Sequence, residues 1–247
     1  MANFQPLKNY ILYCVDRLID QYGLAGPFLD AGCGAGDVSR HLAAKGWKGK
    51  AIDFSDVAVA RARTVLSGFP GVSLEKKSLF DENDVFKTVL MMDMIEHIED
   101  DAQALKKTCS LLEAGGHLVI STPSNPREWR WDDDFYGHYR RYTENEIKEK
   151  LGSAGFETVI VWDFTYPVFW MMRRMYTALK SPFVRFEKNK LSRTQESSAA
   201  NAFDIPGVTG LLSANIIPWS FVYRMQFKNH RNKIGHGHEM IVLARKI

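Results

Sequence analysis

The chain has 247 residues, of which 45% are hydrophobic and 25% charged, a composition that excludes disordered, collagen-like and coiled-coil proteins. The formal net charge of +3 is too small to require a nucleic acid partner. Three scattered cysteines form no disulfide framework and suit a reducing cytoplasm, and no apolar run approaches the roughly 20 residues that cross a bilayer.

Strand and helix patterns alternate along the chain after an amphipathic helix at residues 7–19. Apolar runs predict strands at residues 27–30, 50–54, 72–76, 88–92, 117–121, 157–162 and 240–244. Helical spacing lies between them at 37–44, 56–66, 100–112 and from Thr143, and Gly115 with Gly116 is expected to end the third of these helices. This order predicts a doubly wound, mostly parallel seven-stranded sheet with helices on both faces.

The chain is expected to form a single domain over residues 1–247. An N-terminal helix at 1–24 precedes a core at 25–163 and 239–247, and an α-rich insertion at 164–238 should cap the substrate side. The end of that insertion, residues 229–238, is expected to be a solvated turn.

Three glycines follow the first strand, in the sequence Asp30-Ala-Gly32-Cys-Gly34-Ala-Gly36. Glycines let a backbone turn tightly and approach a ligand, while the next helix presents amide donors. Asp53 ends the second strand, where a carboxylate can accept both hydroxyls of a ribose. The pattern indicates a nucleoside cofactor, and its G-x-G-x-G spacing differs from the G-x-G-x-x-G of nicotinamide sites.

Residues 28–36 resemble the first motif of class I S-adenosylmethionine (SAM) dependent methyltransferases, and Asp53 falls where that family binds the ribose. The resemblance implies that Asp30 and Gly32 lie near the methionine part of SAM and Phe54 against the adenine. Ser78 stands where many members carry an aspartate. The cofactor residues expected on this basis are Asp30, Gly32, Gly34, Gly36, Asp53, Phe54, Ser78 and Asp93.

The fourth strand leads into Asp93, Glu96 and His97, which share one face if the segment turns helically. With His138 they would form a site for Mg²⁺ or Mn²⁺. The set is similar to the metal sites of small-RNA 2′-O-methyltransferases and ubiquinone-biosynthesis O-methyltransferases, with Asp93 in place of a glutamate. The alternative is that Glu96 and His97 shape the SAM pocket without a metal.

Residues 132–142 are dense in histidine, tyrosine and arginine and should lie over the reaction side of the sheet. His138 or His97 could act as the general base. Tyr139, Arg140 and Arg141 are candidate substrate residues, and either arginine could clamp a carboxylate or phosphate. The alternative for each arginine is a structural ion pair with one of the aspartates at 132–134.

Residues 173–193 carry a net charge of +6, whereas the rest of the chain carries −3. Large apolar residues precede this basic run at 164–172. Such a segment can lie on an anionic membrane surface, line a channel for an amphiphilic substrate, or simply pack. No recognised RNA-binding module accompanies it, so nucleic acid is not favoured.

The sequence thus predicts a cytoplasmic SAM-dependent methyltransferase whose small or lipid-like acceptor offers a hydroxyl oxygen, with peripheral membrane contact through residues 164–193. Two alternatives stay open: an NAD(P)-dependent reductase, and a non-catalytic membrane-associated binding protein of the same fold. The sequence assigns no oligomeric state.

Overall fold

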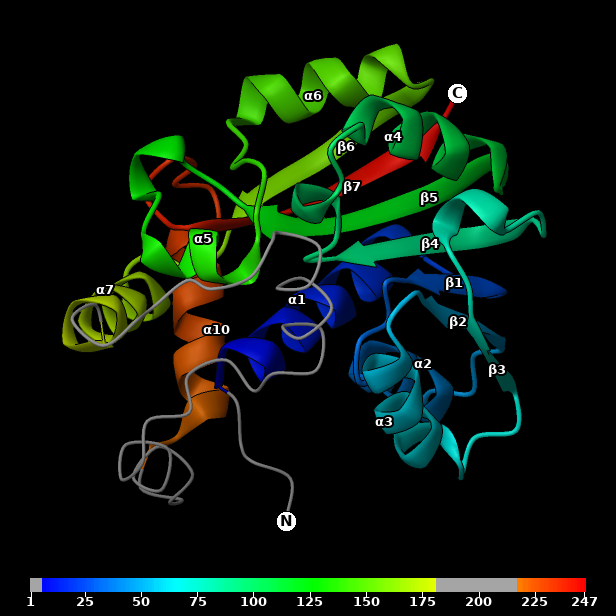
Figure 1. Cartoon of the computed structure of the whole chain (residues 1–247). Coiled ribbons are helices and arrows are strands. Elements are labelled where there is room, and N and C mark those ends of the chain that lie inside the picture. The colour runs from blue at the N-terminus through cyan, green and yellow to red at the C-terminus, as the bar shows by residue number, and fades with distance from the viewer. Residues whose placement is uncertain (1–5, 181–216) are drawn as a thin grey trace.

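A computed structural model describes residues 6–180 and 217–247 and contains a seven-stranded sheet (Figure 1). The strand order is β3-β2-β1-β4-β5-β7-β6, and β7 runs antiparallel to both of its neighbours. The strands are β1 (Phe28–Ala31), β2 (Gly49–Asp53), β3 (Val72–Lys76), β4 (Phe86–Met92), β5 (Leu112–Pro123), β6 (Phe156–Asp163) and β7 (Glu239–Lys246). The predicted doubly wound sheet is confirmed.

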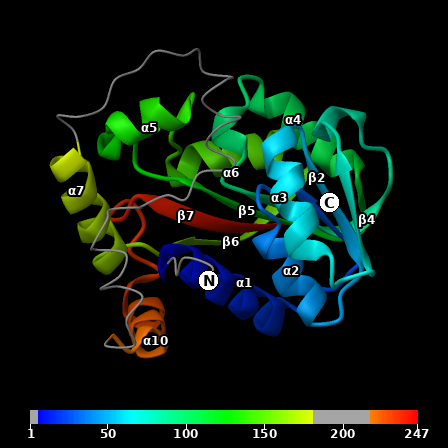
Figure 2. The ribbon, with the colours of Figure 1, turned by 60° about the horizontal axis from the view of Figure 1, so that its bottom comes forward.

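Helices cover both faces of the sheet, as Figure 2 shows. One face packs against α4 (Asp101–Ser110) and α6 (Glu144–Ser153). The other packs against α1 (Pro6–Tyr22), α2 (Asp37–Ala44), α3 (Asp56–Leu66) and α10 (Trp219–His230). Two further helices, α5 (Trp131–Tyr136) and α7 (Val168–Lys180), lie beyond the carboxyl end of β5.

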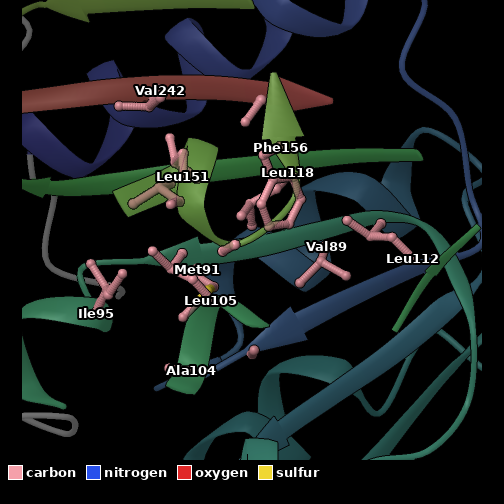
Figure 3. Close-up of a cluster of buried hydrophobic side chains, with 14 of the residues drawn as sticks. Val89, Met91, Ile95, Ala104, Leu105, Leu112, Leu118, Leu151, Phe156 and Val242 are labelled. Atoms are coloured by element: carbon pink, nitrogen blue, oxygen red, sulfur yellow. The ribbon is translucent and has the colours of Figure 1, made fainter. Parts of the chain in front are cut away.

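Alternate residues of the central strands point to opposite faces and fill two hydrophobic cores. Figure 3 shows the core under α4 and α6, where Met91 of β4 lies beside Leu105 and Val89 lies between Leu118 and Leu112. The second core includes Tyr10 of α1, which stacks on Tyr223 of α10 with ring centroids 5.3 Å apart. The central strands are therefore buried on both faces, as a parallel sheet requires.

The chain order reverses between β1 and β4, which are neighbours in the sheet. The loop after β1 leads toward β2, and the loop after β4 leads toward β5, so the two loops diverge. Open α/β sheets bind ligands in the crevice at this point. The loops that follow β1, β2 and β4 thus define where to look for a site.

One expectation about chain organisation is wrong. Gly115 and Gly116 do not end the helix, which stops at Ser110; they lie in β5, where the pairing with β4 shifts register. The end of the insertion lies beside the N-terminal helix: α10 packs on α1, and Tyr223 donates a hydrogen bond to the carbonyl of Pro6. The interior of the insertion, residues 181–216, lies outside the described residues.

Among residues 6–180 and 217–247, we find no helix with the length and apolar character needed to traverse a lipid bilayer.

Candidate active site

A tight loop connects β1 to α2 and holds three glycines in left-handed conformations. The φ angles are 70° for Gly32, 53° for Gly34 and 81° for Gly36. A Cβ atom on Gly32 would lie 2.9 Å from Cγ of Met94, and one on Gly36 would lie 3.2 Å from Cβ of Ala62. The positive φ angles and the lack of room for a Cβ atom both favour glycine here, so these three positions add no side chain to the loop.

Asp53 joins this glycine loop to the end of β2. Its Oδ2 atom accepts a hydrogen bond from the Gly34 amide at 2.9 Å, and its Oδ1 atom accepts one from the Ser55 amide at 2.8 Å. The carboxyl group is buried, and burial raises its pKa above the ordinary value. Phe54 follows with 38% of its surface exposed. An acid and an accessible aromatic ring therefore stand together beside the loop.

Two further expected cofactor residues have internal partners. Asp30 is buried, and its carboxylate accepts hydrogen bonds from Ser39 through Oγ at 2.6 Å and the amide at 3.1 Å. Burial raises the pKa of Asp30 to about 6. Ser78 accepts a hydrogen bond from the Phe80 amide at 3.3 Å and so caps the short helix η1 (Leu79–Asp81). Their contacts to a cofactor stay predictions.

Asp93 lies at the end of β4 with a φ of 50° and an exposed side chain. Its Oδ1 atom accepts a hydrogen bond from Oγ of Ser121 at 2.7 Å. The predicted helical face for Asp93, Glu96 and His97 does not form, because only a short helix, η2 (Ile95–His97), follows the strand. Asp93 is therefore not grouped with the other predicted metal ligands, which corrects that part of the expected set.

Glu96, His97 and His138 do come together, with one potential ligand atom from each lying within 4.8 Å of the others. Glu96 is fully buried; its Oε2 atom accepts a hydrogen bond from Thr122 at 3.0 Å, and Oε1 has no partner among the described residues. Burial lowers the pKa of His97 to about 3, so its imidazole is neutral. The cluster offers one carboxylate and two imidazole rings.

The side chain of His138 is hydrogen-bonded to Asp133 of α5. Its Nδ1 atom lies 2.9 Å from Oδ1 of Asp133, which is buried. Although burial acts to raise it, the pKa of Asp133 is held below its ordinary value by the hydrogen bond from His138 and by the guanidinium groups of Arg141 and Arg173. An ionised carboxylate and an imidazole therefore form a buried pair.

Both candidate substrate arginines have internal partners: Arg141 has one of the aspartates expected as the alternative, and Arg140 has a different one. Arg141 is buried and donates to Asp133 and to the carbonyls of Ser124 and His238. Arg140 pairs with Asp101 at 2.9 Å and also donates to a backbone carbonyl. Neither guanidinium stands open as an anion clamp, which corrects that expectation, whereas Tyr139 is half-buried beside the cluster.

The sequence reasoning missed His238 and Glu239 at the start of β7. Both nitrogens of His238 and the Oε2 atom of Glu239 are buried without a hydrogen-bond partner in the described part of the chain. His238 is thus no part of a solvated turn. No spacing rule could have found them, because it is the antiparallel pairing of Pro123 with Glu239 that brings this end of β7 to the site.

Comparison with known proteins places this geometry in a family. The model of the family described as "Methyltransferase domain" matches residues 9–161. Curated ubiquinone biosynthesis O-methyltransferases of Pseudomonas paraeruginosa and Alkalilimnicola ehrlichii are each 30% identical to this chain over 138 residues. The matches cover 52% of this chain and 58% and 53% of those proteins, so the chain spans little more than half the length of these relatives.

Solved structures share the fold at low sequence identity. Magnesium protoporphyrin IX methyltransferase of Synechocystis with bound S-adenosylhomocysteine (SAH) superposes with a TM-score of 0.57 and 16% identity, over 98% of this chain and 84% of its own. The cyclase SpnF superposes with a TM-score of 0.61 and 18% identity, over 95% and 80%. Because a cyclase and a methyltransferase both match, these similarities establish the fold alone.

Proposed function

The chain belongs to the methyltransferase-domain family, and from this premise we propose that it transfers the methyl group of SAM to a hydroxyl oxygen of a small or amphiphilic acceptor. One observation carries the proposal: the three left-handed glycines after β1 are joined to Asp53 by the hydrogen bond from the Gly34 amide. A bare backbone beside a carboxylate, at the switch point of the sheet, suits an adenosyl group.

The cofactor residues have distinct tasks in this proposal. Asp53 accepts the ribose hydroxyls, Phe54 packs against the adenine, and Asp30 lies beneath the loop near the methionine part. When bound, SAM supplies a methyl group already activated on a sulfonium sulfur. The protein then has to align the acceptor and manage one proton. The G-x-G-x-G loop, with Asp30 ahead of it, disfavours a nicotinamide dinucleotide because a carboxylate there repels its pyrophosphate.

His138 is the base that we assign to that proton. A pKa near 3 makes His97 too weak a base at neutral pH, whereas His138 receives support from the ionised Asp133. Tyr139 would contact the acceptor beside it. The choice of oxygen as the acceptor atom takes its support from the relatives in Pseudomonas and Alkalilimnicola, which are named O-methyltransferases.

The alternative to a free base is a metal site: we propose that, where His138 does not take the proton, Glu96, His97 and His138 hold a divalent metal ion. The unpartnered Oε1 atom of Glu96 and the neutral His97 are the donors that a cation requires. Without Asp93 the set contains two imidazoles and one carboxylate, which favours a first-row transition ion such as Mn²⁺ over Mg²⁺. Bound there, the ion would lower the pKa of an acceptor hydroxyl.

An amphiphilic acceptor fits the exposed side of α7. Met171, Met175 and Leu179 recur every fourth residue and are all more than half exposed, so they form an apolar stripe. Arg173 does not add to a basic surface as the sequence suggested, because it is buried in ion pairs with Asp132 and Asp133. We propose peripheral membrane contact through the stripe; residues 181–193 lie outside the described residues.

Methyl transfer from radiolabelled SAM tests the proposal on the purified full chain. Matched acceptors would be a catechol with an alkyl tail, the same catechol without it, and the corresponding aniline. We expect label in the catechols and little in the aniline, with the His138→Gln variant strongly impaired. Transfer to the aniline alone, or oxidation of NADH without any transfer, would contradict it.

A further inference from the structure

The orientation of His138 depends on a carboxylate five residues before it. Asp133 lies in α5 and accepts a hydrogen bond from Nδ1 of His138 at 2.9 Å. An ionised carboxylate can only accept, so the proton of the neutral imidazole must be on Nδ1. The lone pair is then on Nε2, the ring nitrogen that remains to act toward Glu96 and His97.

Within the described residues, every other group hydrogen-bonded to the Asp133 carboxylate is also a donor. Arg141 donates to Oδ1 from Nε and from its terminal nitrogen, both at 2.8 Å. Arg173 of α7 and the backbone amide of Arg130 donate to Oδ2, again at 2.8 Å each. These donors fix the carboxylate on both oxygens, so it has no freedom to turn away from the imidazole.

We propose that Asp133 is a positioning residue: it holds His138 in the Nδ1–H tautomer and so leaves the Nε2 lone pair for the site that Glu96 and His97 complete. The inference rests on the proposed function, since it assigns Asp133 a part in that reaction through His138 alone. The inference also gives α7 a role, because Arg173 of α7 donates a hydrogen bond to the carboxylate that orients His138.

Asp133→Asn gives the sharpest test. The asparagine must direct its NH₂ group at one of the former donors. Among these partners, only the imidazole can become an acceptor, by moving its proton to Nε2. The variant should therefore invert the tautomer of His138 and remove the lone pair from Nε2, at nearly constant side-chain volume.

Asp132→Asn is the matched control. Asp132 is also buried and also binds Arg173, at 2.6 Å, but it makes no hydrogen bond to His138. This variant weakens the same ion-pair network at the neighbouring residue and should leave the tautomer of His138 unchanged. Comparing the two variants thus distinguishes a general loss of stability, which both should show, from a change at His138, which only Asp133→Asn should show.

Long-range ¹H–¹⁵N spectra of the full chain labelled on histidine report the tautomer directly, with the His138 signals assigned from His138→Gln. We expect Nδ1–H in the wild type and in Asp132→Asn, and Nε2–H in Asp133→Asn. A wild-type imidazole protonated on Nε2, or an unchanged Asp133→Asn spectrum, would overturn the inference. If the Asp133 variant does not fold, the wild-type spectrum alone still decides.

Kinetics give the second readout. For Asp133→Asn we expect kcat to fall about 10- to 100-fold, the usual effect of losing a residue that orients a reactive histidine, with KM for SAM unchanged. A normal kcat together with an inverted tautomer would reject the catalytic part of the inference. An inactive wild type would reject the proposed function while the spectra remain decisive for the tautomer.

Discussion

Asp30 carries a carboxyl group in the apolar region between β1 and α2. Burial raises its pKa to about 6 from 3.8, so the folded protein binds this proton more tightly than the unfolded chain does. Its contribution to stability is fully present below pH 4 and is lost as the pH rises through 6. Above that pH the ionised group destabilises the protein.

Asp30→Asn should therefore stabilise the cofactor-free protein at alkaline pH. The gain should be small at pH 4 and grow to about 1–3 kcal/mol at pH 8, because the amide carries no charge and can still accept from Ser39. Thermal unfolding across that pH range measures it. A variant that loses stability relative to the wild type as the pH rises would contradict this assignment.

Residue identity and spacing were enough to predict the tight glycine turn and the position of Asp53 beside it, whereas the cofactor contacts of these residues stay predictions. Glycine is needed where φ is positive, and a carboxylate ending the second strand has few other uses beside such a loop. The same reasoning failed for Arg141. A guanidinium is equally suited to an external anion and to Asp133, and only the folded position of α5 decides between them.

Helices α5 and α7 are joined by a buried ion cluster. Arg173 donates to both oxygens of Asp132 and to Asp133, and all three side chains are buried. Removing one partner of a buried pair leaves charges uncompensated. Arg173→Met should therefore lower the free energy of unfolding by about 3–5 kcal/mol, measured by urea denaturation.

Arg174 provides the control on the same helix. It pairs with Glu128 and lies 4.1 Å from the Trp170 ring, but its side chain is 43% exposed. Water screens such a pair, so Arg174→Met should cost about 1 kcal/mol or less. Equal losses of unfolding free energy in the two variants would show that the buried ion cluster is not what stabilises the contact between α5 and α7.

The candidate metal ligands come from two elements, η2 and the segment after α5. If an ion is bound there, chelation should lower kcat at least about 100-fold, since Lewis-acid stabilisation is worth several kcal/mol. Mn²⁺ should restore activity better than Mg²⁺, and Glu96→Gln should purify with less metal by elemental analysis. A metal-free protein with full activity would remove the ion from the proposal.

Element positions followed the hydrophobic pattern closely, and the main error was local. Gly115 and Gly116 suited a helix end, but a glycine pair is equally typical of an irregular strand. A Cβ on Gly116 would lie 3.0 Å from the Glu113 carbonyl of the same strand and 3.1 Å from the Lys87 carbonyl of β4, so both the local backbone and the strand pairing disfavour a side chain there. The contact with Lys87 depends on a neighbouring strand, which no local pattern contains.

At the scale of the whole molecule, alternating strands and helices predicted the sheet, but the completion of the site was beyond the sequence. β7 enters antiparallel beside β5 and carries Glu239 to the end of the strand that holds Thr122 and Ser121. The two described helices of the insertion make different contacts: α7 binds Asp133 through Arg173, and α10 packs on α1. Such relations arise from topology, over separations of 40 residues or more.

Calorimetric titration of the full chain with SAM tests the claim that the glycine loop and Asp53 bind the cofactor. We predict a single site in the wild type, an affinity at least about tenfold weaker in Asp53→Ala because the ribose hydroxyls lose their acceptor, and no change in Asp56→Ala, whose carboxylate is exposed three residues further on. Absence of binding to the wild type, or equal affinity in Asp53→Ala, would contradict the claim.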